Sequence, residues 1–230
     1  MVRKSNDGSH KQPATRRAHR RDHRRDAILR AAAKLFRERG FADTGMRDIA
    51  QAADLSAANL YHYFDGKHDL LVYCQERALD RMLDAMTATR RVSPAAERLR
   101  LVLTAHLHTI LDEIEGATAH LQLESLPPPM RAGLVKKRDQ YEQALRRLLA
   151  EGIRSGEFVD TDPAIVARAM LGAMNWTVTW FRPNGPETAV DVGAMISGFL
   201  VRGIAGTSVT KDALAAPARG NKSKQKGRRS

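Results

Sequence analysis

Apolar residues recur through most of this chain at the three- and four-residue spacing of amphipathic α-helices, with almost no strand-like alternation. An early helix ends at Gly40 and carries on one face Ile28, Ala31, Ala32, Leu35 and Phe36. Beyond residue 65 the pattern predicts helices over 66–91, 94–115, 117–125, 129–155, 161–181 and 186–205, separated by proline- and glycine-containing breaks. With two short helices inside residues 44–64, we expect an all-α fold of about nine helices.

Residues 44–64 predict two short helices joined by a tight turn. The Thr44 hydroxyl is expected to cap the first of them. Asp54 falls at the turn, where a left-handed backbone is often needed and Asp tolerates it. Ser56 is expected to cap the second helix. A second helix in this setting enters the major groove of DNA, so the segment indicates a helix–turn–helix.

The residues on both sides of this segment resemble a known family. Residues 24–75 are similar to the DNA-binding domain of TetR-family transcriptional regulators, in the runs F-R-E-R-G-F (36–41), T-G-M-R-D-I-A (44–50) and L-Y-H-Y-F-D-G-K-H-D-L (60–70). Asp54 replaces the customary turn glycine, and Ala58 stands where glycine is frequent in the recognition helix. The resemblance implies a three-helix DNA-binding domain followed by a helical ligand-binding and dimerisation domain.

The net charge of +12 is concentrated at the two ends of the chain. Residues 1–25 carry nine Lys or Arg against two Asp, and residues 211–230 carry seven against one. Both ends lack apolar residues to bury, so we expect them to be disordered when free. We divide the chain into a basic arm (1–23), a helix–turn–helix domain (24–70), a ligand-binding and dimerisation domain (71–207) and a basic tail (208–230). The arm either adds salt-sensitive affinity for DNA or is only a solubilising extension.

Other chemistry-bearing residues argue against several classes of protein. The single cysteine, Cys74, rules out an internal disulfide, fits a reducing cytoplasm and is expected to pack as a small apolar residue. No run of about 18 apolar residues predicts a membrane span, and no signal peptide is expected. His106 and His108 would point about 200° apart on a helix, so with His120 they do not favour a metal site. No enzyme signature is present, and we expect neither an enzyme nor a cofactor.

The last two predicted helices favour a homodimer. The apolar face of the helix from Asp162 to Phe181 comprises Val166, Ala169, Met170, Ala173 and Thr177, and that of the helix from Pro186 comprises Val190, Ala194, Phe199, Leu200 and Gly203. In the TetR family such a pair packs against its twofold mate as a four-helix bundle. The alternative is that both helices close the core of one monomer. We favour the dimer because a single domain would read too few base pairs for useful specificity.

Trp176 and Trp180 are spaced i, i+4, so both lie on one side of a helix. They are expected either to line a ligand pocket or to pack in the core or at the dimer contact. The run W-F-R-P-N-G-P (180–186) resembles a TetR subgroup that senses CoA thioesters, including repressors of fatty-acid and steroid-ring degradation. That resemblance implies an acyl or polycyclic CoA thioester as effector. The apolar tunnel would be lined by Leu103, Leu107, Ile110, Met170, Met174 and Trp176, with His106 and Glu124 or Glu113 as polar partners. The CoA phosphates would meet basic side chains such as Arg131, Arg138, Arg147 or Arg182, unless Arg182 only caps its helix.

We expect a homodimeric repressor that reads a palindrome in double-stranded DNA and is released by a small hydrophobic ligand. Thr44, Tyr61 and Lys67 would mainly hold phosphates, and Arg47, Ala57, Asn59 and His62 would lie nearer to base edges. Ser56 and Tyr63 complete the expected DNA surface. Two alternatives stay open. One is a repressor of efflux genes that senses amphipathic drugs through carboxylates such as Glu113 or Glu124. The other is a nonspecific architectural protein that uses its basic ends.

Overall fold

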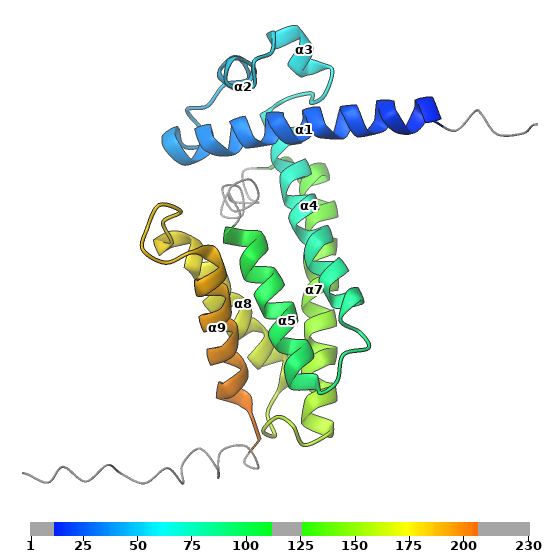
Figure 1. The fold of residues 1–230 in the computed structure, drawn as a ribbon, viewed down its shortest axis with the longest axis vertical. Coiled ribbons are helices and arrows are strands. Elements are labelled where there is room, and N and C mark those ends of the chain that lie inside the picture. Colours follow the sequence, from blue (N-terminus) through cyan, green and yellow to red (C-terminus); the bar gives the residue numbers. More distant parts are fainter. Residues whose placement is uncertain (1–11, 112–125, 207–230) are drawn as a thin grey trace, which may run out of the picture.

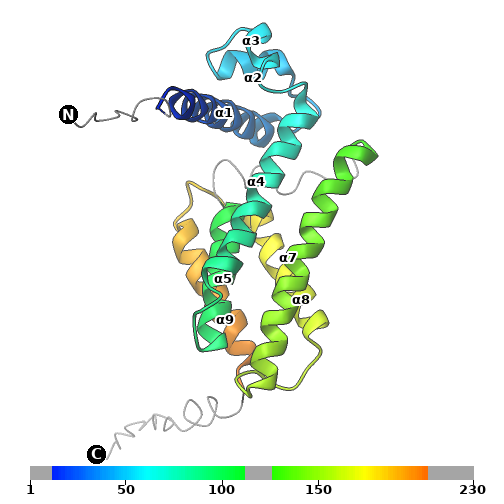
Figure 2. The same ribbon diagram turned by 90° about the vertical axis from the view of Figure 1, so that its right-hand side faces the viewer.

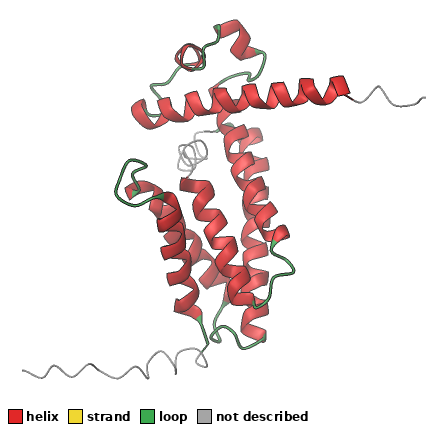
Figure 3. Cartoon of the chain, viewed as in Figure 1, coloured by secondary structure: helices red, strands yellow, loops and turns green. Residues whose placement is uncertain are grey.

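The computed structural model describes residues 12–111 and 126–206, and all the regular structure in these ranges is helical (Figures 1 and 3). The described helices are α1 (Gln12–Arg39), α2 (Met46–Ala52), α3 (Ala57–Tyr61), α4 (Lys67–Ala88), α5 (Ala95–Leu111), α7 (Pro128–Arg154), α8 (Pro163–Trp180) and α9 (Ala189–Ile204). The predicted all-α fold is therefore confirmed. Of the predicted helices, the one over 117–125 lies outside the described residues, as do residues 1–11 and 207–230.

Figures 1 and 2 show two layers of different size. The head consists of α1, α2 and α3, with α1 lying across the long axis of the molecule. The body consists of α5, α7, α8 and α9, which run roughly along that axis. Helix α4 begins at the head and runs down into the body, where it lies beside α5 and α7. This arrangement places the predicted helix–turn–helix at one end of the molecule.

Helix α1 begins earlier than the sequence predicted. Residues 12–23, part of the predicted basic arm, lie in the first turns of α1. The physical reason is that alanine, arginine and glutamine are good helix formers, and they continue a helix already anchored by its packed half. Among the residues of α1 whose burial is described, the first that are fully buried are Ile28 and Leu29.

The head has its own apolar core. Its fully buried members are Ile28, Leu29, Ala32, Ile49, Leu60, Leu70 and Cys74, which come from α1, α2, α3 and α4. Gly40, which ends α1, has φ +84°, a left-handed conformation that favours glycine. Cys74 is buried among these residues, as expected of a small apolar side chain.

The body has a second and larger core. Leu99, Leu103 and Leu107 of α5 meet Leu134, Leu145 and Leu148 of α7, Ala167, Met170 and Met174 of α8, and Val192 of α9. Helix α4 contributes to both cores, since Leu70 belongs to the head core and the next residue, Leu71, to the body core. Among the described helices, none is both long and apolar enough to cross a membrane.

Candidate functional site

The helix–turn–helix is built from α2, α3 and the turn between them. Asp54 has φ +54°, which confirms the left-handed turn predicted at this position. The Leu55 N–H donates to the Ala50 carbonyl oxygen at 2.9 Å and closes the turn. The Ser56 hydroxyl accepts from the Asn59 N–H at 3.2 Å, so the predicted cap of the second helix is present. These bonds fix the angle at which α3 leaves α2.

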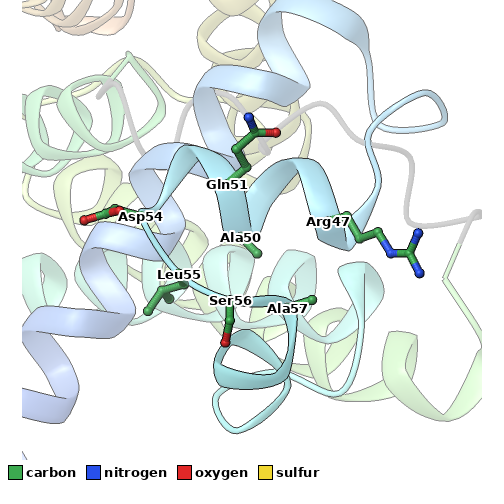
Figure 4. Close-up of a pocket in the computed structure, with 7 residues that line it drawn as sticks. All are labelled: Arg47, Ala50, Gln51, Asp54, Leu55, Ser56 and Ala57. Carbon is green, nitrogen blue, oxygen red and sulfur yellow. The ribbon is translucent and has the colours of Figure 1, made fainter.

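The outer face of α3 carries side chains suited to DNA. Leu60 is fully buried in the head core, which turns Asn59 and His62 outward and leaves Tyr61 52 % exposed. Arg47 of α2 is exposed next to this face. An open hollow of about 490 Å³ lies between α2 and the start of α3, with a lining of Arg47, Ala50, Gln51, Asp54, Leu55, Ser56 and Ala57. Figure 4 shows Arg47 and Asp54 at opposite ends of the hollow.

Thr44 does not cap α2, contrary to the prediction. Its side chain is buried and its hydroxyl donates to the Gly40 carbonyl oxygen at 2.7 Å, so it binds the end of α1 instead. The N-cap of α2 is Gly45, whose N–H donates to the Asp48 carboxylate at 2.9 Å. A hydroxyl both donates and accepts, and sequence alone does not show which helix end it will reach. Its predicted role of holding phosphate is therefore not available to the side chain in this arrangement.

Lys67 is also engaged within the protein. Its ammonium group donates to the carbonyl oxygens of Phe41 at 2.9 Å and Ala42 at 3.0 Å. It also lies 4.7 Å from the centre of the Phe41 ring. The sequence predicted a phosphate contact, whereas the geometry makes Lys67 a tie between α4 and the loop after α1. Tyr63, the remaining residue of the predicted surface, is half-buried and packs against the head core.

The body contains a chain of polar groups from three helices, of which the His106 and Tyr141 side chains are buried and Asn175 is exposed. The Nδ1 atom of His106 on α5 lies 3.1 Å from the Tyr141 hydroxyl of α7, and its Nε2 atom lies 3.2 Å from Oδ1 of Asn175 on α8. Burial lowers the pKa of His106 to about 4, against a smaller opposing effect of the Asn175 hydrogen bond, and burial raises the pKa of Tyr141. His106 is therefore neutral and Tyr141 protonated near pH 7.

Tyr141 and Asn175 were not among the predicted site residues. Tyr141 shares one face of α7 with Leu145 and Leu148, at i, i+4 and i+7, so a polar hydroxyl within an apolar stripe was the available signal. Asn175 gave no comparable signal, because it lies next to the buried Met174 on an exposed part of α8. Glu113, Glu124 and His120, named as pocket or metal candidates, lie outside the described residues. No cluster of three or more metal-ligating side chains occurs in the described ranges.

The predicted apolar pocket lining divides into two groups. Leu103, Leu107, Ile110, Met170 and Met174 are all buried in one cluster of the body core, and their role as a pocket lining stays a prediction. Trp176 and Trp180 are 67 % and 48 % exposed, so their predicted place beside those residues is wrong within a single chain. Residues 174 and 176 are about 200° apart around a helix, and burial of one turns the other outward.

The arginines that were predicted to contact the CoA phosphates are also dispersed over the structure. Arg182 donates to the Phe181 and Thr179 carbonyl oxygens at 3.2 and 3.4 Å, which is the helix-capping role weighed as its alternative. Arg131 is half-buried near the start of α7. Arg138, further along α7, donates to the Gln75 side chain of α4 at 3.3 Å.

The outward face of α8 and α9 is apolar, although its members differ from those predicted. Met170 and Thr177 point into the body core, with exposures of 2 % and 1 %. The exposed apolar residues of this face are Ile165, Ala169, Ala173, Trp176 and Trp180 on α8, and Val190, Ala194, Met195 and Phe199 on α9. An uncovered apolar face of this kind marks an interaction surface.

A helix–turn–helix head on a helical body of this kind defines a DNA-binding transcriptional regulator. Comparison with known proteins agrees: the model for bacterial regulatory proteins of the tetR family matches residues 28–74, and the model for the tetracyclin repressor-like C-terminal domain matches residues 92–204. The chain belongs to the TetR family of transcriptional regulators.

Several members are similar over most of their length. The chain is 28 % identical over 188 residues to the HTH-type transcriptional repressor KstR2 of Mycobacterium tuberculosis, covering 78 % of this chain and 92 % of KstR2. The solved structure of the TetR-family regulator PfmR from Thermus thermophilus is 35 % identical, with a TM-score of 0.69 and coverage of 76 % and 97 %. AibR, solved with isovaleryl coenzyme A and operator DNA, is 25 % identical, with a TM-score of 0.67 and coverage of 79 % and 97 %.

Proposed function

We propose that the protein is a homodimeric repressor that binds a palindromic operator and leaves it when a CoA thioester from lipid or steroid catabolism occupies the body. The observation that carries the dimer is the exposed apolar face of α8 and α9. Trp176 and Phe199 are each 67 % exposed on this face, and contact with a second copy would remove them from water.

Two copies joined through α8 and α9 would present two α3 helices to one side of a duplex. A twofold dimer reads two half-sites about one helical turn apart, in successive major grooves. Asn59 suits a bidentate contact with adenine. Ala57 at the start of α3, His62 at its end and Arg47 on α2 would contact the neighbouring base edges. Tyr61, exposed at the end of α3, would hold phosphate.

The effector class is supported by relatives and by the chemistry of the body. AibR was solved with an acyl-CoA, and a structure of KstR2 describes that relative as a ketosteroid regulator. The body of this chain holds a large apolar cluster with the Tyr141 hydroxyl and His106 ring buried in it. An acyl or steroid group suits the apolar part, and a thioester carbonyl suits a buried hydroxyl.

Helix α4 would carry the signal between effector and DNA. Its first half belongs to the head core, and polar contacts tie its second half to α7, including the Lys137–Asp80 ion pair at 2.8 Å. The Asp26 carboxylate of α1 pairs with Arg77 of α4. A movement of α4 would therefore move the head with it. An effector that tilts α4 would change the separation of the two heads. Release requires the effector to bind the non-DNA arrangement more tightly by a few kcal/mol.

The competing effector class is an amphipathic cationic drug, which would need carboxylates in the pocket. The carboxylates named for that alternative, Glu113 and Glu124, lie outside the described residues. The nonspecific architectural alternative is tested by deleting residues 1–23 and 208–230. Sequence-selective binding by the trimmed protein would exclude it.

The first experiment is thermal unfolding of the purified protein with acyl-CoA and steroid-CoA thioesters, the matching free acids and cationic drugs. A ligand at 100 times its dissociation constant adds about 2.7 kcal/mol to the free energy of unfolding, which shifts the melting temperature measurably. A shift with a thioester and none with its free acid supports the proposal. A shift with cationic drugs alone would overturn the proposal of a thioester effector and favour a regulator of efflux genes.

A further inference from the structure

The hollow between α2 and the start of α3 lies at the outer end of the head, where the side chains suited to DNA are gathered (Figures 1 and 4). Arg47, which lines the hollow from α2, is exposed. Ser56, which lines it at the cap of α3, is exposed as well. A recognition helix meets base edges with its first residues, so this hollow lies where a duplex would be read.

The two ends of the hollow differ in charge. Figure 4 shows Arg47 and Ala57 toward one end, and Asp54 and Leu55 toward the other. Arg47 carries a positive charge and Asp54 a negative one. Because a duplex is densely negative, it is attracted to the Arg47 end and repelled from the Asp54 end. Ala57 therefore lies at the end of the hollow that DNA would approach.

Ala57 makes the wall of the hollow apolar at this end. Its half-buried side chain is a single methyl group, which neither donates nor accepts a hydrogen bond. Ala50 and Leu55 add further apolar lining inside the hollow. A polar base edge pressed against such a wall would lose its hydrogen bonds to water without replacement. The one apolar group among the base edges of the major groove is the C5-methyl group of thymine, so that group is the complement of this wall.

From this geometry we infer that the hollow receives the C5-methyl group of a thymine in each half-site of the operator, in contact with the side chain of Ala57. The inference rests on the proposed function, because it concerns the contact between the helix–turn–helix and its operator. It assigns to Ala57 a recognition of one base through apolar contact. Asn59 and Arg47 would read hydrogen-bonding groups of the same duplex.

The test removes one methyl group from the DNA and one from the protein. The probe is a duplex containing the palindrome recovered by in vitro selection with the full-length protein. In further duplexes each thymine of the half-site is replaced in turn, in both half-sites, by uracil, which lacks only the C5-methyl group. Ala57→Gly removes the methyl group from the protein. Ala58→Gly is the matched control, because Ala58 is the next residue of α3 and is not part of the lining of the hollow.

We expect one thymine of the half-site to be sensitive to this replacement in the wild type. Uracil there should weaken binding about fourfold for each half-site, the value of one buried methyl group, and so about fifteenfold for both. Ala57→Gly should bind the thymine and uracil duplexes with nearly equal affinity, whereas Ala58→Gly should keep the wild-type ratio. A ratio measured on one protein cancels any general effect of glycine on α3. Circular dichroism checks that both variants are folded.

Three results would overturn the inference: a half-site in which no uracil replacement weakens binding, an Ala57→Gly variant that keeps the full ratio, or an Ala58→Gly variant that loses it equally. The first removes the methyl contact, the second places it outside the hollow, and the third reduces it to a general change in α3. A failure of the proposed function is distinguishable, because the selection would then recover no preferred palindrome. A recovered palindrome without a uracil-sensitive thymine would remove this inference alone.

Discussion

The ammonium nitrogen of Lys67, in the first turn of α4, lies 2.9 Å from the carbonyl oxygen of Phe41 in the loop that follows α1. The same nitrogen also donates to the Ala42 carbonyl, and it lies over the Phe41 ring. A charged donor that binds several carbonyls stabilises one conformation of the loop. Because this loop leads into α2, the Lys67 contacts fix the position of the helix–turn–helix relative to α4.

Replacing Lys67 with methionine should destabilise the head by about 1–3 kcal/mol, because the loop carbonyls lose a charged donor. DNA affinity should fall, while the salt dependence of binding stays as in the wild type. A phosphate-binding lysine would instead reduce the salt slope by about one per contact. Thermal unfolding and DNA titration at several salt concentrations separate the two roles. Lys136→Met, at an exposed site on α7, is the matched control.

Asn59 and Tyr61 lie on the exposed part of α3 and are expected to act differently on DNA. Tyr61→Ala should weaken binding to all sequences alike, because a phosphate contact carries no base information. Asn59→Ala should change the preference between sequences by about 1–3 kcal/mol at the adenine it contacts. Competition binding over a set of single-base operator variants measures both. If the two variants give the same profile, this division of roles is wrong.

His106 should make the protein less stable in mild acid. Its folded pKa is about 4, against about 6.5 when unfolded, so the unfolded state takes up the proton first as the pH falls. The contribution of His106 to stability is complete above about pH 6.5 and is lost progressively toward pH 4. It amounts to about 2 kcal/mol of lost stability at pH 5.

His106→Gln removes the titrating group and keeps hydrogen-bonding atoms, so its free energy of unfolding should fall by about 2 kcal/mol less than that of the wild type between pH 7 and pH 5. Urea unfolding at each pH measures the difference. His108→Gln, on the exposed side of the same helix, should retain the wild-type dependence. An unchanged pH profile in His106→Gln would show that the ring is not buried as described.

Trp176→Glu should dissociate the dimer, because it places a carboxylate in the centre of the apolar face of α8 and α9. Light scattering should give half the wild-type mass, and affinity for the palindrome should fall more than tenfold. Val135→Glu, at a 41 % exposed position on α7, should leave the mass unchanged. A dimer retained in Trp176→Glu would place the interface elsewhere.

The periodicity of apolar residues was sufficient to predict the described helices, apart from the start of α1. The turn at Asp54 was predicted from the tolerance of Asp for a left-handed backbone, which is also a matter of local geometry. Local patterns were not sufficient for residues whose partners are distant in sequence. Thr44 and Lys67 match a DNA-binding motif, yet their donors are satisfied by carbonyl groups of the head. The pairing of His106 with Tyr141, 35 positions later, depends on how α5 meets α7. Trp176 was predicted to line the pocket because the sequence of α8 alone does not show which of its faces the neighbouring helices cover.

The two cores meet at the adjacent residues Leu70 and Leu71, and this limits how the protein can be recombined with its relatives. A chimaera that joins one head to another body cannot be cut at residue 70 as though a linker lay there, because α4 supplies packing atoms to both sides. Leu70 and Cys74 must travel with the head they fill, and Leu71, Leu79 and Met82 with their own body. A head from one parent can therefore be joined to a body from another only through a hybrid α4. In such a helix the residues that face the head core come from one parent and those that face the body core come from the other.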